Sequence, residues 1–294
     1  MSPIIPCVSS DWAATIAAVA SVGYFARAVP LFRSRNRFSV PSLRLGPAPG
    51  WPAQVYAARQ PLDGRQRALL LWLHAGHFTE GSLAEAHDRS ALLAAAGADV
   101  VALDYPLAPE HPFPAALTAA FEALQDLAAR PARFTGSAAT ALFVGGEEAG
   151  GNLAAALALM ARDQHAPALA GQLLLSPMLD PQLGSASMRD GECGGLECIY
   201  AKGWKAYLGD GIRADHPYAA PLNASRLAGL APALVLRQTG HPLNDESRRY
   251  AAALRAHGGQ VRDLHLDTIT PDGVLNPLHD FLRDAARRAL SLPD

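Results

Sequence analysis

Short, uninterrupted hydrophobic runs recur along the central and C-terminal parts of the chain. Runs without polar alternation are typical of strands buried on both faces, as in a parallel sheet. Turn residues bound each of them, and each holds four to six apolar positions. The five runs are Ala68 to Leu73, Asp99 to Tyr105, Ala139 to Gly146, Gly171 to Pro177 and Pro232 to Gln238. The pattern therefore predicts a parallel sheet built from these segments.

Segments with helical spacing of apolar residues separate these runs. They cover residues 81–97, 112–130, 152–164 and 245–258. Strands that alternate with helices favour right-handed βαβ units and an open, doubly wound sheet. Residues 39–46 and 53–59 instead alternate apolar and polar positions with a period of two, which predicts an antiparallel hairpin at one edge of the sheet.

Two regions interrupt the alternation of strands and helices. They are residues 1–40 and the segment 180–222, which is rich in glycine and aromatic residues. Insertions in such a sheet usually lie over the carboxyl ends of the strands, where ligands bind. We therefore expect N-terminal cap helices at 1–40, and a domain at 41–294 that carries a second cap segment at about 180–222. The apolar stretch that starts at Trp12 is too short to span a bilayer and lacks a basic leader, which predicts a helix that is neither anchor nor signal peptide.

Composition limits the kinds of partner. The chain has 294 residues, of which half are hydrophobic and 18% are charged, which fits one α/β domain or a domain plus a small cap. Its formal net charge of −2 gives no overall field that would favour nucleic acid or an anionic membrane. Its 3 cysteines are too few and too poorly spaced for a disulfide framework or a zinc site. They fit a reducing compartment, so we expect a cytoplasmic protein.

Several motifs together resemble the bacterial hormone-sensitive-lipase family, a group of carboxylesterases. "DYPLAPEHPFPAAL" (Asp104 to Leu117) is similar to the family's signature, and "GGEEAGGNLAAALALMARD" (Gly145 to Asp163) to its strand, elbow and helix. "HPYAAPL" (His216 to Leu222) fits a later segment. The resemblance covers nearly the whole chain. It implies an α/β-hydrolase fold, a mostly parallel twisted sheet with helices on both faces and a helical cap, and no organic cofactor. Function depends on the site residues, so the fold alone does not imply esterase activity.

The resemblance also assigns the site positions. The serine of the family's G-x-S-x-G elbow corresponds to Glu148, and the triad acid to His241 in "HPLNDE". The triad histidine corresponds to Asp272 in "TPDGV", with His265 or His279 as alternatives in another register. The oxyanion loop, H-G-G-G-F in the family, reads "HAGHF" here, so that His77 replaces a glycine. The implied backbone donors are Gly76, His77 and Ala149, and the implied ligand-pocket residues are His74, Phe78, Glu147, Trp204 and Tyr207.

These replacements leave several functions open, none of them that of an ordinary serine esterase, because glutamate has no hydroxyl. The first is acid–base chemistry: Glu148 with a raised pKa, beside an Asp272–His241 pair, would serve elimination, isomerisation or cyclisation of a small carbonyl-bearing or acyl-like molecule. The second is an inactive protein that binds a small apolar ligand. The third is a hydrolase with Glu148 as nucleophile.

A metal site made of Glu148, Asp272, His241 and His77 is a further hypothesis, but pairing of these groups without metal is expected. In each case the partner is a small-molecule ligand or substrate, with no nucleic acid and no membrane. The resemblance also allows a homodimer.

Overall fold

The computed structural model describes residues 42–58, 60, 62, 66–190, 198–210 and 214–291. The predicted N-terminal cap helices at 1–40 and part of the second cap segment lie outside these residues. Pro41–Asp294 forms one compact unit, and the following description concerns this unit alone.

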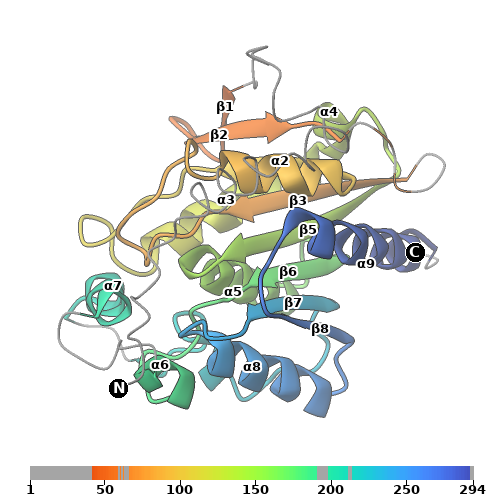
Figure 1. Ribbon diagram of the computed structural model, residues 1–294. Coiled ribbons are helices and arrows are strands. Elements are labelled where there is room, and N and C mark those ends of the chain that lie inside the picture. The colour runs from red at the N-terminus through yellow and green to blue at the C-terminus, as the bar shows by residue number, and fades with distance from the viewer. Residues whose placement is uncertain are drawn as a thin grey trace, which may run out of the picture. The chain divides into compact units, whose positions relative to one another are not determined.

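An eight-stranded sheet runs through this unit (Figure 1), in the order β1-β2-β4-β3-β5-β6-β7-β8. The β1–β2 and β2–β4 pairs are antiparallel, and the other neighbours are parallel. The strands are β1 (Ser42–Leu45), β2 (Trp51–Tyr56), β3 (Arg67–Leu73), β4 (Ala98–Leu103), β5 (Thr140–Glu147), β6 (Gly171–Leu175), β7 (Ala233–Gln238) and β8 (Val261–Leu266). The five predicted strands and the edge hairpin are confirmed.

Burial explains why the central strands read as unbroken apolar runs. Every residue of β4 and β6 is buried, and so is every residue of β3 after Arg67. The strand β8 was not predicted. It lies at the edge of the sheet, its sequence is "VRDLHL", and none of its residues is fully buried.

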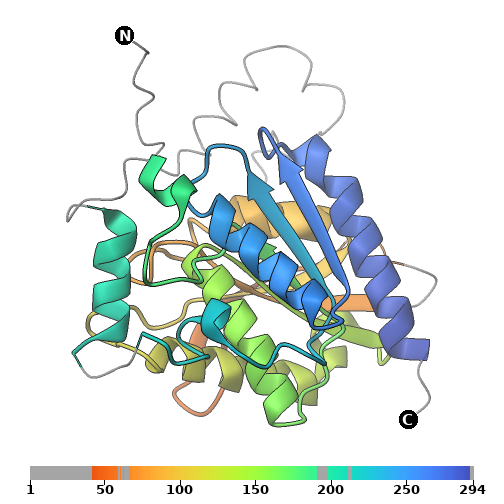
Figure 2. The ribbon, with the colours of Figure 1, turned by 90° about the horizontal axis from the view of Figure 1, so that it is seen from below.

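Helices cover both faces of the sheet (Figures 1 and 2). On one face, α2 (His87–Ala95) and α9 (Pro271–Ser291) contact each other and the central strands. On the other, α5 (Ala149–Asp163) contacts α3 (Ala115–Ala129) and the sheet, and α8 (Asn244–Ala256) contacts β7. A short helix, α4 (Pro131–Thr135), precedes β5. None of the helices in the described part of the chain is long and apolar enough to cross a membrane.

The described part of the segment at 180–222 combines short helices with turns and irregular stretches. It contains α6 (Ala186–Asp190), α7 (Ile199–Leu208) and the 3-10 helix η1 (Pro221–Asn223). Where this segment leaves the sheet after β6, the Glu246 carboxylate accepts hydrogen bonds from the backbone N–H groups of Leu179 (2.6 Å) and Asp180 (2.7 Å).

Helix α7 lies directly on the loop that follows β3. A Cβ atom added to Gly203 would overlap the backbone oxygen of His77, so only glycine allows this approach. The other end of α7 is fixed by the N–H of Phe113, which donates to the backbone oxygen of Tyr207 at 2.7 Å. The cap helix and the β3 loop therefore share one packed interface.

Candidate active site

Glu148 occupies the sharp turn between β5 and α5. Its backbone angles are φ 49° and ψ −111°, which place a non-glycine residue outside the usual regions. A Cβ atom on Gly146 would overlap the backbone of Gly150, and one on Gly150 would overlap the oxygen of Leu73. The turn thus has the strained geometry of a nucleophile elbow, with a carboxylate at its apex.

The loop after β3 faces this elbow. Gly76, His77 and Phe78 all have positive φ, and the N–H of Gly76 donates a hydrogen bond to the Glu148 carboxylate. Gly76 was expected to donate to an oxygen of the substrate. In this structure the Gly76 N–H donates to the Glu148 carboxylate instead.

The segment that follows β4 holds this loop in place. The Tyr105 hydroxyl donates to the backbone oxygen of His74 at 2.8 Å, and the two rings stack with their centroids 4.2 Å apart. The N–H of Ala108 donates to the oxygen of Phe78 at 2.9 Å. His74, which was expected to line the pocket, is only 3% exposed, and its backbone oxygen helps to hold the loop.

Two further side chains contact the Glu148 carboxylate. The distance from His77 Nε2 to Glu148 Oε2 is 3.3 Å, and the Tyr200 hydroxyl of α7 donates a hydrogen bond to the same carboxylate. The rings of His77 and Tyr200 meet edge to face, 5.0 Å apart. Tyr200 was not predicted as a site residue, because no motif or spacing links a cap residue to the elbow.

Burial favours the neutral forms of both Glu148 and His77. It raises the pKa of Glu148 to about 7, with a further rise from the charge of Glu147, while the donors Gly76 and Tyr200 oppose the shift. Burial also lowers the pKa of His77, against an opposing effect of Glu80. At neutral pH the shifts of both pKa values therefore disfavour a fixed ion pair between the two groups, although their atoms lie 3.3 Å apart.

Glu147, an expected pocket residue, is bound by an arginine of α2. Its two carboxylate oxygens each lie 3.1 Å from a nitrogen of Arg89, in a bidentate arrangement. Both side chains are largely buried, with exposures of 14% for Arg89 and 18% for Glu147. The negative charge of Glu147 is thus compensated by the positive charge of Arg89.

His241 lies in the loop after β7 and belongs to the same electrostatic cluster. Its Nδ1 accepts a hydrogen bond from the N–H of Leu243 at 3.2 Å, so the neutral ring carries its proton on Nε2. Burial lowers the pKa of His241, His77 lowers it further, and Glu147 opposes both effects. His241 therefore lies close enough to His77 for their charges to interact, although His241 makes no hydrogen bond with Glu148 among the described contacts.

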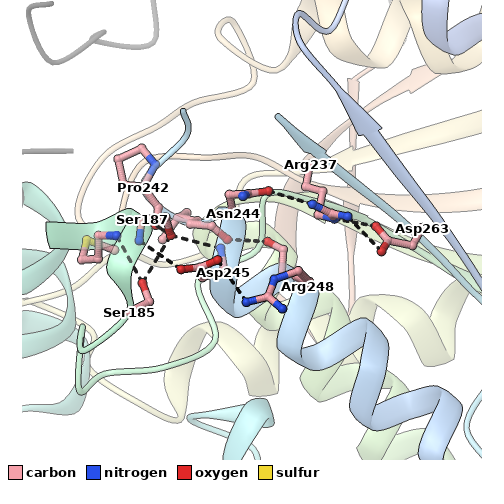
Figure 3. A network of polar contacts seen from close by, with 11 residues as sticks. Ser185, Ser187, Arg237, Pro242, Asn244, Asp245, Arg248 and Asp263 are labelled. Carbon is pink, nitrogen blue, oxygen red and sulfur yellow. Dashed lines mark hydrogen bonds and ion pairs between the residues drawn. The ribbon is translucent and has the colours of Figure 1, made fainter. Parts of the chain in front are cut away.

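A polar network joins the loop of His241 to the cap (Figure 3). The Ser187 hydroxyl of α6 donates to the backbone oxygen of Pro242 at 2.7 Å and accepts from the N–H of Asp245 at 3.1 Å. The Ser187 N–H in turn donates to the Asp245 carboxylate at 3.0 Å. On the sheet side, Arg237 binds Asn244 and Asp263. The position of His241 is thus fixed from both sides.

The structure gives no contact in support of Asp272. This residue is exposed in the first turn of α9, and in the described part of the chain no hydrogen bond or ion pair joins it to Glu148, His77 or His241. The alternatives are also engaged elsewhere: His265 is exposed on β8 beside Thr239, and the Nδ1 of His279 lies 3.1 Å from the backbone oxygen of Ala96. The place predicted for Asp272, between Glu148 and His241, remains a prediction.

The other expected pocket residues form an aromatic cluster. Phe78 stacks on Tyr207 with centroids 3.8 Å apart and lies 5.1 Å from the Trp204 ring. None of the three is more than 2% exposed, so in this structure they pack against one another. Within the described ranges, no group of three or more His, Cys, Asp or Glu side chains is arranged to hold a metal ion.

Comparison with known proteins identifies the family. Residues 70–267 match the α/β-hydrolase fold family. This chain belongs to that family. It is 37% identical over 240 residues to the carboxylic ester hydrolase LipN of Mycobacterium tuberculosis, an alignment that covers 79% of this chain and 62% of LipN. It is 35% identical over 232 residues to the esterase LipI of the same organism, covering 76% of this chain and 71% of LipI.

Solved structures agree with this membership. The hyperthermophilic esterase of Pyrobaculum calidifontis superimposes with a TM-score of 0.73 at 30% identity, over 86% of this chain and 87% of that protein. The expected α/β-hydrolase fold is confirmed. The chain aligns with less than two thirds of the length of LipN, so the activity of that whole protein is no more than a guide here.

Proposed function

We propose that this member of the esterase/lipase family acts as an acid–base enzyme, with Glu148 as the group that takes up and returns a proton. The observation that supports this most directly is the state of the elbow carboxyl. It is 8% exposed, its pKa is raised to about 7, and it lies 3.3 Å from an imidazole. A general acid–base group works best when its pKa lies near the working pH.

The surroundings of Glu148 suit removal of a proton next to a carbonyl group. When Glu148 takes that proton, its carboxylate loses its charge and binds the Gly76 N–H less strongly. The same N–H then becomes available to the substrate oxygen, where the negative charge develops. His77 can return the proton, and the Nε2–H of His241 is a further donor. The reaction class is elimination, isomerisation or cyclisation of a small carbonyl-bearing or acyl-like molecule.

Two alternatives follow from particular observations. Because the Glu148 carboxylate engages Gly76, a protein that binds a small apolar ligand without turning it over is the second candidate. Because the relatives LipN and LipI are named as esterases, hydrolysis with Glu148 as a carboxylate nucleophile is the third. That reaction forms a covalent ester on Glu148, visible as a mass increase on the corresponding peptide.

A pair of chromogenic probes tests the proposal. 5-Nitrobenzisoxazole opens when a base removes its carbon-bound proton, and p-nitrophenyl acetate reports ester hydrolysis. We expect the first reaction to be catalysed with a rate that rises through about pH 7, and to be lost in Glu148→Gln. Glu110→Gln, the same substitution at an exposed position, should keep the wild-type rate.

Each other result has a definite meaning. Ring opening that is undiminished in Glu148→Gln would refute the role of Glu148. Hydrolysis of p-nitrophenyl acetate that depends on Glu148 and leaves an ester on it would establish the nucleophilic mechanism instead. If neither probe turns over, the acid–base proposal fails and the binding protein is favoured.

A further inference from the structure

Among the residues that the structure describes, the charges around Glu148 are not balanced. The charge of Glu147 is matched by the bidentate contact with Arg89. The partners of Glu148 are neutral donors, the Gly76 N–H and the Tyr200 hydroxyl, together with the imidazole of His77. An ionised Glu148 therefore gains hydrogen bonds from its described partners but no matching positive charge.

We infer that the site takes a ligand whose group beside Glu148 is positively charged, a protonated amine or another organic cation. This inference rests on the proposed function only in placing the ligand at Glu148. A cation supplies the charge that the buried carboxylate lacks, and charge pairs are strong where water is largely excluded. An anionic ligand would instead enter beside two carboxylates, while the guanidinium of Arg89 is already occupied by Glu147.

The hydrogen-bonding groups of the site support this ligand class. A carboxylate offers about four acceptor positions on its two oxygens; the Gly76 N–H and the Tyr200 hydroxyl use two of them, and His77 Nε2 lies 3.3 Å from Oε2. The remaining positions can accept the N–H groups of an ammonium. His241 cannot accept a hydrogen bond from the ammonium, because its Nδ1 already accepts from the Leu243 N–H and its Nε2 carries a proton. Solvent reaches the pair, since the side-chain exposures are 10% for Glu148 and 15% for His77.

Cation binding and proton binding then exclude each other at Glu148. The charged and titratable groups that face this cluster are Glu147 with Arg89, His77 with Glu80, Tyr200 and His241. Since burial raises the pKa of Glu148 to about 7, a cation should bind more tightly as the pH rises through this value, and binding near pH 7 should release a proton.

Three probes with one ring and different charges test the inference by titration calorimetry: benzylammonium, benzyl alcohol and benzoate. At pH 8 we expect benzylammonium to bind about tenfold or more tightly than benzyl alcohol, and benzoate to bind most weakly. At pH 6 the preference should shrink, although benzylammonium is still charged. The Glu148→Gln variant keeps the shape of the side chain and should lose the preference, whereas Glu110→Gln should retain it.

The inference is overturned if the wild-type protein binds the three probes equally, prefers benzoate, or keeps its preference for benzylammonium in Glu148→Gln. 5-Nitrobenzisoxazole is uncharged, so the two proposals fail separately. Ring opening without a preference for cations would overturn the ligand class alone. A preference for cations without ring opening would overturn the acid–base function and leave a cation-binding protein.

Discussion

Replacing Glu148 with glutamine should make the protein more resistant to unfolding at high pH. In the folded protein, burial raises the pKa of this carboxyl from 4.5 to about 7. Between these two values the folded state binds more protons than the unfolded state, so the stability that the protonated carboxyl contributes is present below pH 4.5 and lost as the pH rises through 7. Glutamine is never charged, so the variant does not lose stability in this way as the pH rises.

The size of the effect follows from the pKa difference. At about 1.4 kcal/mol per pKa unit, the change from 4.5 to about 7 corresponds to about 3.5 kcal/mol in full. Because Glu148 is only 8% exposed, solvent screens this penalty little. Glutamine retains a carbonyl oxygen that can accept from the Gly76 N–H, so the hydrogen bond is not the source of the difference.

Urea unfolding of both proteins between pH 4.5 and pH 8.5 measures this effect. The free energy of unfolding of Glu148→Gln minus that of the wild type should increase by about 3 kcal/mol over this range and level off above pH 7. Glu110→Gln, at an exposed position, should differ from the wild type by less than about 0.5 kcal/mol at every pH. A difference for Glu148→Gln that is independent of pH, or that decreases with pH, would refute the reasoning.

Three further variants test the surroundings of the site. Tyr200→Phe removes a hydroxyl that donates to the Glu148 carboxylate, so the midpoint of the pH–rate profile with 5-nitrobenzisoxazole should move upward by roughly half a unit to one unit. Gly203→Ala places a Cβ atom against the backbone oxygen of His77 and should lower the free energy of urea unfolding by about 1–3 kcal/mol. Gly184→Ala, where the nearest atom is 4.0 Å away, should not lower it. Glu246→Ala leaves two backbone N–H groups unpaired and should lower the thermal unfolding temperature more than Glu246→Gln, which keeps an acceptor.

The central part of the fold could be predicted because strands that are buried on both faces of the sheet appear in the sequence as unbroken apolar runs. Strands β3, β4 and β6 are almost wholly buried and contain unbroken apolar runs. The edge strand β8 contains no apolar run, since polar residues such as Arg262 and His265 face solvent. Helix α2 begins at His87, six residues after the start of the predicted segment at 81, because residues 83–86 form turns instead of helix.

The site could be predicted where a motif fixes the backbone. The elbow and the β3 loop place Glu148 and His77 together, as expected from their motifs. Tyr200 could not be predicted, because its contact depends on how α7 packs on the β3 loop through Gly203. The assignment of Asp272 rested on a register of diverged residues, and in the structure this residue is exposed in the first turn of α9. Residues that act through long-range packing thus leave little signal in a single sequence.

The proton affinity of Glu148 tests the account most directly. Carbon-13 NMR of protein labelled at the glutamate carboxyl carbons, recorded against pH for the wild type and for Glu148→Gln, isolates the resonance of this side chain. We predict a carboxyl that titrates with a midpoint of about 7 and whose signal is missing from the variant. A Glu148 resonance that titrates below pH 5 would contradict the account, because the elbow carboxylate would then be a fixed negative charge with no proton to exchange at neutral pH.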